Sequence, residues 1–478
     1  MVTVKTDIFP AWLALLVLMI VALSVNRDGL FVATMCLLPF GALNVPGLPL
    51  SLNVIFIPAL LGLFFKPKRP RSALQKYIFI ALSIYFAVMI ISVVQTYIFS
   101  SLAPPTGVLD PQFGIRASRH RGWYQIVAQL LLVLLFYYGY RYAQTSRGLR
   151  TAVKWIVAIS IPAAGFGIYE FIAKLVGLPL VFFAFESSDY VSKAVLETSL
   201  FRFPRVYGTG VEPAYYGNFL LIPFSLCLVL LLLYPRRSRL VRYAAWLLPV
   251  VACSLFLTFS TGAWAAATVT LIFTLLLARV RGIALLLTVG FLLTFSLTML
   301  PANSLPAYLP EIGQSHVSKV EASFEEMDAR GIGRARAMEI GEQFPVLGVG
   351  LGNEMLWMGN ANMEIGSYNI FLAQLSEMGI IGLLSFLLLI SVIARSLYLG
   401  YRRGGSSLAG LVSAACLAAF MGMLVSHMSW SSRFIPSEWF ALGLGCGAAR
   451  LASSEKRLAW ASSEDTSCAS DQASKKWK

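Results

Sequence analysis

Residues 215–234 read YYGNFLLIPFSLCLVLLLLY and carry no charge. A bilayer core about 30 Å thick needs roughly 20 apolar residues in one helix, which is the length of this run. Similar runs recur along the 478 residues, of which 58% are hydrophobic and 13% charged. A soluble protein carries about a quarter charged residues. Because the runs are continuous and do not alternate as barrel strands do, the sequence predicts membrane-spanning helices.

The predicted fold class is an all-α polytopic membrane protein with about 12–14 transmembrane helices and one long periplasmic loop, 301–367. The second apolar run is short and precedes Pro46-Gly47, so it is interpreted as tilted or re-entrant. The candidate spans are 9–26, 29–44, 52–65, 77–99, 123–142, 152–172, 215–234, 241–259, 262–278, 283–300, 368–394, 406–427 and 437–450.

Basic residues set the predicted orientation. The chain has 38 Lys and Arg against 23 Asp and Glu, a net charge of +15. Most of this excess lies in short loops, which is typical of positive-inside topology rather than of a nucleic-acid partner. The tail after Leu451 is predicted to be disordered and cytoplasmic. The outward segments are 100–122 (despite its own arginines), 173–214, 301–367 and 428–436, and the basic clusters are Lys66–Arg71, Arg147–Lys154, Arg236–Arg239, Arg279 with Arg281, and Arg402 with Arg403.

Neither a disulfide framework nor a metal site is predicted. Five of the six cysteines lie in predicted membrane helices, and Cys468 lies in the tail. His120, His316 and His427 are far apart in sequence and show no metal-binding spacing. No internal repeat is evident, which argues against a transporter built from repeated halves. We therefore expect chemistry at the outer ends of the helices, without a metal or cofactor.

Three stretches carry candidate chemistry. The first is Arg205-Val-Tyr-Gly-Thr-Gly-Val-Glu212-Pro213, where spaced glycines permit a tight turn before a helix. An arginine at such a turn can clamp a phosphate with two parallel hydrogen bonds. The alternative is an interfacial arginine that reaches to lipid headgroups.

The second stretch, 325–339, contains Arg330, Arg334 and Arg336 and is predicted to be helical with interruptions at its glycines. In a helix Arg330 and Arg334 share a face, and Arg336 lies off it. Three arginines at an outer membrane surface suit a polyanionic headgroup. The alternative is a simple surface ion pair between Glu326 and Arg330.

The third stretch is 344–353, which is rich in glycine, followed by Tyr368 to Gly382. It follows no predicted strand, so a dinucleotide site is not expected. The glycines after Glu377 suit close helix packing. His427 ends a predicted span nearby and is a candidate proton acceptor or a simple interfacial residue.

Taken in order, these pieces resemble the O-antigen ligase and polymerase superfamily, which includes exopolysaccharide and capsule polymerases. The resemblance covers roughly 200–385, and the predicted helix count agrees with it. It rests on an Arg-x-x-Gly-Thr turn, a Ser-x-Gly-Ala helix start, a long outer loop ending in Pro-x-x-Gly-x-Gly, and a final helix motif. The residues are Arg205, Gly208 and Thr209; Ser260 to Ala263; Pro345, Gly348 and Gly350; and Asn369, Leu372, Leu375, Glu377 and Gly379.

Two departures from the ligase pattern favour a polymerase. Ligases of this superfamily carry Arg where this chain has Thr261, and His where it has Tyr368. The resemblance then implies an enzyme that joins oligosaccharide repeat units carried on undecaprenyl pyrophosphate, at the outer face of the bacterial inner membrane. The implied pyrophosphate-binding residues are Arg205, Arg330, Arg334 and Arg336, and the implied catalytic candidates are Glu212, Tyr368, Glu377 and His427.

The resemblance also implies the organisation and partners of the chain. The expected parts are helices over 1–199, the ligase/polymerase-like core 200–394, helices over 395–450 and the tail 451–478. The expected partners are the lipid-linked oligosaccharide and the bilayer, together with a flippase and chain-length or export proteins. Two other functions stay open: an O-antigen ligase, and a flippase or exporter of lipid-linked sugars that catalyses no reaction.

Overall fold

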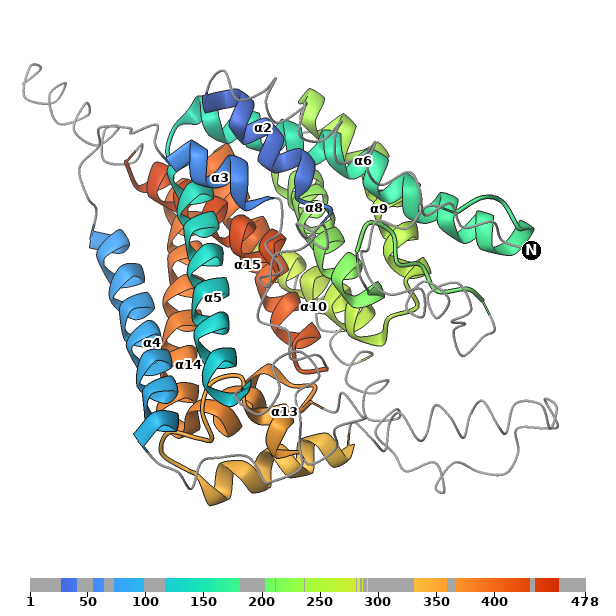
Figure 1. The fold of residues 1–478 in the computed structure, drawn as a ribbon. Helices are drawn as coiled ribbons and strands as arrows, with labels where there is room; N and C mark the ends of the chain where they lie inside the picture. The colour runs from blue at the N-terminus through green and yellow to red at the C-terminus, as the bar shows by residue number, and fades with distance from the viewer. Residues whose placement is uncertain are drawn as a thin grey trace, which may run out of the picture.

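The computed structural model describes residues 27–40, 55–63, 73–98, 117–180, 203–280 except 211 and 236, 282–283, 286, 290, 331–358, 366–429 and 435–454. Within these residues all regular structure is helical (Figure 1). The helices are α2 Arg27–Leu37, α3 Phe56–Leu63, α4 Ala73–Ile98, α5 Ala117–Tyr142, α6 Ser146–Val176, α8 Pro213–Leu233, α9 Arg239–Leu257, α10 Thr261–Leu277, α13 Glu354–Trp357, α14 Ile370–Gly404 and α15 Leu408–Ser426, with further helices over 331–343 and 436–454.

Seven helices in the described part of the chain are long and apolar enough to cross a bilayer: α4, α5, α6, α8, α9, α14 and α15. The predicted all-α polytopic membrane class is thereby confirmed. The predicted spans 9–26 and most of 283–300 lie outside the described residues, so the total of 12–14 helices stays a prediction. The run at 29–44 gives only α2, whose 11 residues rise about 16 Å and do not span a bilayer alone.

Hydroxyl side chains begin several of these helices. The residues Thr145, Ser238, Ser260 and Ser407 precede α6, α9, α10 and α15, and each accepts a hydrogen bond from a backbone N–H of the first turn. Such a cap satisfies a donor that has no partner within the helix. The observed starts of α9, α10 and α15 lie within two residues of the predicted spans, whereas α6 begins six residues before its predicted start.

The centre of the bundle is formed by α8, α10 and α15, which pack against one another (Figure 1). About three quarters of the apolar stretch of α8 (78%) and of α15 (72%) is buried by other helices, against 33% for α9. Small residues allow this close packing. A Cβ atom at Gly422 of α15 would lie 2.2 Å from Thr270 Oγ1 and 2.4 Å from the Ala266 carbonyl oxygen of α10.

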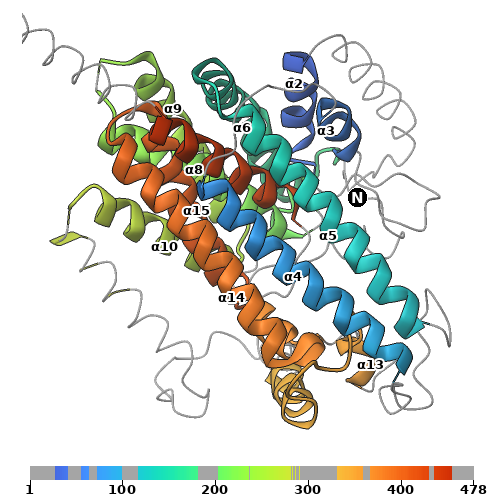
Figure 2. The same ribbon diagram turned by 90° about the vertical axis from the view of Figure 1, so that its left-hand side faces the viewer.

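Two groups of helices flank this centre. On one side α4 packs against both α5 and α14, and the three run side by side (Figure 2). On the other side α6 packs against α9. At one end of the bundle lie α13 and the helix 331–343, drawn in gold in Figure 1. The helix 331–343 continues through Gly333, so that glycine does not interrupt it as the sequence predicted, whereas residues 325–330 of the predicted stretch lie outside the described residues.

The helix α14 is broken at Gly379, where the backbone takes φ 65° and ψ −165°. A break inside a helix leaves backbone groups without partners unless another segment supplies them. The glycine-rich segment 345–350 does so. Its Val349 and Gly350 N–H groups donate to the carbonyls of Ser376 and Glu377, at 2.9 and 3.0 Å. On the far side of the break, Ile380 N–H donates to the Pro345 carbonyl at 2.8 Å.

Glycine is required at both surfaces of this contact. A Cβ atom at Gly348 would lie 2.4 Å from the Glu377 carbonyl carbon, and one at Gly379 would lie 2.3 Å from that of Val346. The side chain of Gln95 in α4 closes the contact by donating to the Leu347 and Gly348 carbonyls. The close packing predicted for the glycines after Glu377 is observed at Gly379, against the segment 345–350.

Candidate functional site

Four helix ends meet at the end of the bundle that carries helix 331–343. The start of α8 touches the start of α10, where a Cβ atom at Gly217 would lie 2.5 Å from Ala263 Cβ. One at Gly262 would lie 2.5 Å from Ser429 Oγ, in the turn after α15. The first N–H of α14, from Ile370, donates to the His427 carbonyl at 3.0 Å. We call this region the loop end of the bundle.

A buried histidine and carboxylate pair lies at the loop end. His427 follows the last residue of α15, and its Nε2 is 2.8 Å from Oε2 of Glu438, in the first turn of helix 436–454. The two side chains are 7% and 10% exposed. The second oxygen of Glu438, Oε1, is buried without a hydrogen-bond partner among the described residues. With Nε2 protonated toward the carboxylate, the lone pair of the neutral imidazole lies on Nδ1.

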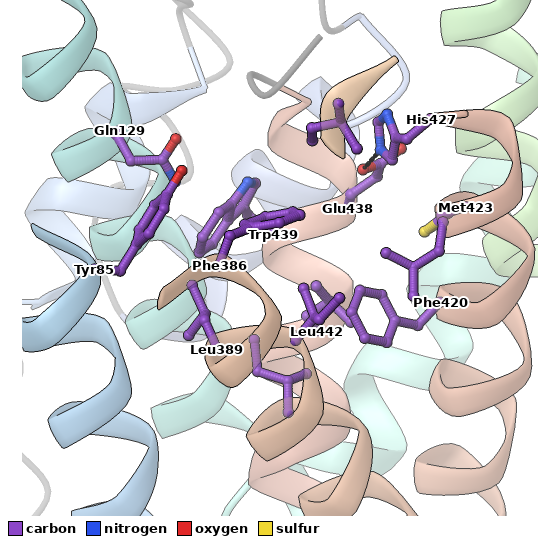
Figure 3. Close-up of a pocket in the computed structure, with 14 residues that line it drawn as sticks. Tyr85, Gln129, Phe386, Leu389, Phe420, Met423, His427, Glu438, Trp439 and Leu442 are labelled. Atoms are coloured by element: carbon purple, nitrogen blue, oxygen red, sulfur yellow. Dashed lines mark hydrogen bonds and ion pairs between the residues drawn. The ribbon is translucent and has the colours of Figure 1, made fainter. Parts of the chain in front are cut away.

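This pair lines a cavity whose other walls are mainly apolar (Figure 3). His427 and Glu438 lie on one side and Tyr85 and Gln129 on the other, with Trp439 between them. Gln129 is 1% exposed, and its Nε2 has no hydrogen-bond partner among the described residues. The remaining lining residues are Ile370, Phe386, Leu389, Ile390, Ile393, Phe420, Met423, Leu424 and Leu442.

Of the two loop arginines among the described residues, Arg334 is the one in contact with the turn that follows His427. Its Nη2 donates to the Met428 carbonyl at 3.5 Å, and its Nε is buried without a hydrogen-bond partner among the described residues. Arg336 instead donates to the Met358 carbonyl, just after α13. Arg330 lies outside the described residues. Arg334 and Arg336 therefore differ in role, one at the site and one holding the loop.

Arg205 belongs to a second cluster, against α6. Its carbonyl accepts a hydrogen bond of 2.6 Å from Lys174 Nζ, and Lys174 is paired with Glu170 one turn earlier, also at 2.6 Å. The N–H of Val206 donates to the Leu257 carbonyl at the end of α9, at 3.2 Å. These contacts fix the backbone that carries Arg205. They do not join it to Arg334 or His427, so a shared pyrophosphate site stays a prediction.

The other predicted site residues have identifiable structural positions. Glu212 is exposed at the N-cap of α8 and makes no side-chain capping bond. Tyr368 is half-buried with φ 47°, a strained value for a residue with a side chain, directly before the N-cap Asn369 of α14. Glu377 is buried, and its carbonyl accepts from Ser92 Oγ at 3.0 Å as well as from Gly350. Of these three, Tyr368 lies nearest in the chain to the contact between α14 and His427.

Sequence reasoning missed Glu438, Glu170 and Lys174. A signal existed for each, because an acidic residue inside a predicted span is costly unless it has a partner. Glu438 is the one acidic residue of the predicted span 437–450, and Glu170 lies within 152–172. Lys174 stands four residues after Glu170, the spacing of an ion pair along a helix. The sequence did not show that Glu438 pairs with His427, because the two residues lie in different segments of the chain, His427 directly after α15 and Glu438 in helix 436–454.

No family model and no curated protein sequence matches this chain. The resemblance to the O-antigen ligase and polymerase superfamily therefore rests on the ordered motifs alone. Within the described residues no three His, Cys, Asp or Glu side chains lie close enough together to hold a metal ion.

Proposed function

We propose that this chain is a membrane glycosyltransferase of the polymerase type, which joins oligosaccharide repeat units carried on undecaprenyl pyrophosphate. The observation that carries the proposal is the buried His427–Glu438 pair in an otherwise apolar cavity between membrane helices. Ionisable side chains are expensive to bury inside a bundle of this kind and usually mark a functional site. The apolar walls suit a substrate attached to a lipid.

The proposed reaction uses His427 as a general base. The acceptor hydroxyl attacks the anomeric carbon of the donor sugar, the new C–O bond forms, and the bond to the lipid pyrophosphate breaks. The pyrophosphate departs with the bonding electron pair, and His427 Nδ1 takes the hydroxyl proton. Glu438 holds the imidazole in the tautomer that can accept this proton and stabilises the imidazolium that results.

An arginine at the loop end supports this assignment, because the departing pyrophosphate accumulates negative charge. Arg334 lies against the turn after His427, with its Nε buried at that contact. A guanidinium binds phosphate oxygens through parallel charge-assisted hydrogen bonds, and such stabilisation is worth most where water is excluded. Arg205 is proposed as a second phosphate ligand on the basis of the family motif. The loop end then faces outward, where lipid-linked repeat units are polymerised.

The test uses purified protein in proteoliposomes supplied with the lipid-linked repeat unit extracted from the producing cells. Polymer is followed as a ladder on a gel. We expect His427→Ala to lower the rate by about 10²-fold or more, the usual contribution of a general base. Glu438→Gln also lowers it, because a neutral amide does not stabilise the imidazolium. Met428→Leu is the matched control, since that exposed side chain neighbours His427 and its backbone carbonyl is kept.

Two results would contradict the proposal. One is a normal polymer ladder from His427→Ala and Glu438→Gln at normal protein abundance. The other is that wild-type protein forms no polymer but moves the lipid-linked unit across the vesicle membrane, which is the behaviour of a flippase. Transfer of a finished polymer to a lipid acceptor, without chain growth, would instead identify a ligase.

A further inference from the structure

An ion pair in α6 is buried at the turn that carries Arg205. Glu170 Oε1 and Lys174 Nζ are 2.6 Å apart, and both side chains are 2% exposed. The 31 residues of α6 rise about 46 Å, more than the apolar core of a bilayer needs. Both residues lie in its last two turns, before the left-handed Gly177 that ends the helix.

This pair makes hydrogen bonds to three backbone groups within residues 205–208. Glu170 accepts from Tyr207 N–H, 3.1 Å from each carboxylate oxygen, and from Gly208 N–H at 2.6 Å. Lys174 donates to the Arg205 carbonyl at 2.6 Å, and its ammonium lies 5.0 Å from the centroid of the Tyr207 ring. The carboxylate and the ammonium thus hold the turn from opposite ends.

The packing around the turn leaves little alternative conformation. Gly208 has φ 59°, and a Cβ atom there would lie 2.5 Å from the Tyr216 ring. The Tyr216 hydroxyl is itself held by the Ala163 carbonyl at 2.8 Å and by Ser254 at 2.7 Å. A buried ion pair is weak evidence for stability, because apolar residues of similar volume often stabilise a protein as well or better. An apolar pair cannot fix one conformation of this backbone in the same way, because it offers no hydrogen bonds to the N–H and carbonyl groups of residues 205–208.

We infer that Glu170 and Lys174 are positioning residues, which hold the backbone of Arg205 to Gly208 in the conformation that aims the Arg205 side chain. This inference rests on the proposed function only for the role of Arg205 as a pyrophosphate ligand. The positioning itself is independent of any reaction. It predicts that loss of the pair frees the turn and weakens the binding of a pyrophosphate, while the rest of the bundle stays folded.

The first measurement is hydrogen exchange of the full-length protein in detergent. In Glu170→Gln the Tyr207 and Gly208 amides lose a charged acceptor and should exchange about tenfold faster or more. The amides of α8 and α9 should be unchanged. Ser225→Ala is the matched control, because it removes a buried hydrogen bond to the Ala415 carbonyl, between α8 and α15, without touching Tyr216 or residues 205–208. Should Glu170→Gln fail to fold, the double variant Glu170→Leu/Lys174→Met removes both charges together and leaves neither ion alone.

The second measurement is the rate of polymer formation against the concentration of lipid-linked donor. We expect the double variant to raise KM about tenfold with kcat changed far less, since His427 and Glu438 are intact. Arg205→Ala should raise KM to the same extent, and combining it with the double variant should add nothing. A merely structural pair would instead lower the amount of active protein and leave KM alone.

The outcomes separate the inference from the proposed function. Unchanged exchange at Tyr207 and Gly208 in both variants overturns the positioning role, whatever the enzyme does. Faster amide exchange with an unchanged KM for the lipid-linked donor overturns the inference that the pair acts on substrate binding through Arg205. Faster exchange in a protein that forms no polymer at all leaves the positioning intact and removes the proposed reaction.

Discussion

At the scale of single residues, the loop arginines show how similar side chains take different roles. Arg336 donates to the Met358 carbonyl and holds the segment after α13, whereas Arg334 contacts the turn after His427 and has a buried Nε without a partner among the described residues. A buried donor without a partner costs free energy, which a bound anion would recover. From the sequence, both arginines were predicted to bind the pyrophosphate, because spacing along a helix does not reveal which neighbouring residues each side chain contacts.

Arg334→Ala and Arg336→Ala should therefore have different effects. The first removes a charge-assisted bond to the pyrophosphate and should raise KM for the lipid-linked donor about tenfold or more. Arg334→Lys should restore only part of this, because an ammonium lacks the planar fork of donors. Arg336→Ala should leave KM nearly unchanged and lower the melting temperature, since it releases a backbone carbonyl. Equal KM values for the two alanine variants would show that Arg334 does not contact the substrate. Initial rates and thermal unfolding in detergent measure both effects.

At the scale of elements, the broken helix α14 is the feature that local sequence determines least. The predicted span 368–394 was right about a helix, and Asn369 begins it by accepting from the Phe371 and Leu372 N–H groups. The break at Gly379 depends on segment 345–350, which is separated from it in the chain and supplies the missing backbone partners. Hydropathy cannot reveal such a break, because the immediate neighbours Met378 and Ile380 are both apolar.

Replacing Gly379 by alanine tests this contact, with Gly405→Ala as the matched control. Both glycines have positive φ, 65° and 53°, so alanine is strained at either one, by about 1–3 kcal/mol. A Cβ atom at Gly405 meets nothing within 4 Å, but at Gly379 it would lie 2.3 Å from the Val346 carbonyl. Gly379→Ala should therefore lower the melting temperature clearly more than Gly405→Ala. Equal shifts would mean that segment 345–350 is not tightly docked.

At the scale of the whole molecule, apolar run length predicted the helical membrane class well, because a span is determined by its own composition. The pairing of helices was not predicted, since lipid-facing and protein-facing side chains are equally apolar. The same contrast, between features of one segment and contacts between segments, holds for the candidate site. Motifs along one segment, such as the Arg205 turn, were found from the sequence, and pairs made between segments, such as His427 with Glu438, were not.

The orientation of the bundle is the remaining prediction at this scale. Beyond the break, residues 380–404 of α14 rise about 37 Å, which is long enough to cross a bilayer, so we expect Ser406 and the loop end on opposite sides of it. Arg402 and Arg403 stand beside Ser406, which predicts an inner location by the positive-inside rule. Arg334 and Arg336 then lie on the outer side, where that rule does not favour basic residues and an anionic substrate gives a reason to keep them.

Cysteine labelling with an impermeant maleimide tests this orientation, in a background without the six native cysteines. Met338→Cys replaces a side chain that is 52% exposed on helix 331–343, and Ser406→Cys replaces an exposed residue at the other end. In intact spheroplasts we expect label on Met338→Cys only, and on Ser406→Cys after permeabilisation. The reverse pattern would place the His427–Glu438 pair on the cytoplasmic side. There it would meet nucleotide-linked sugars rather than exported repeat units, and the proposed polymerase would lose its substrate.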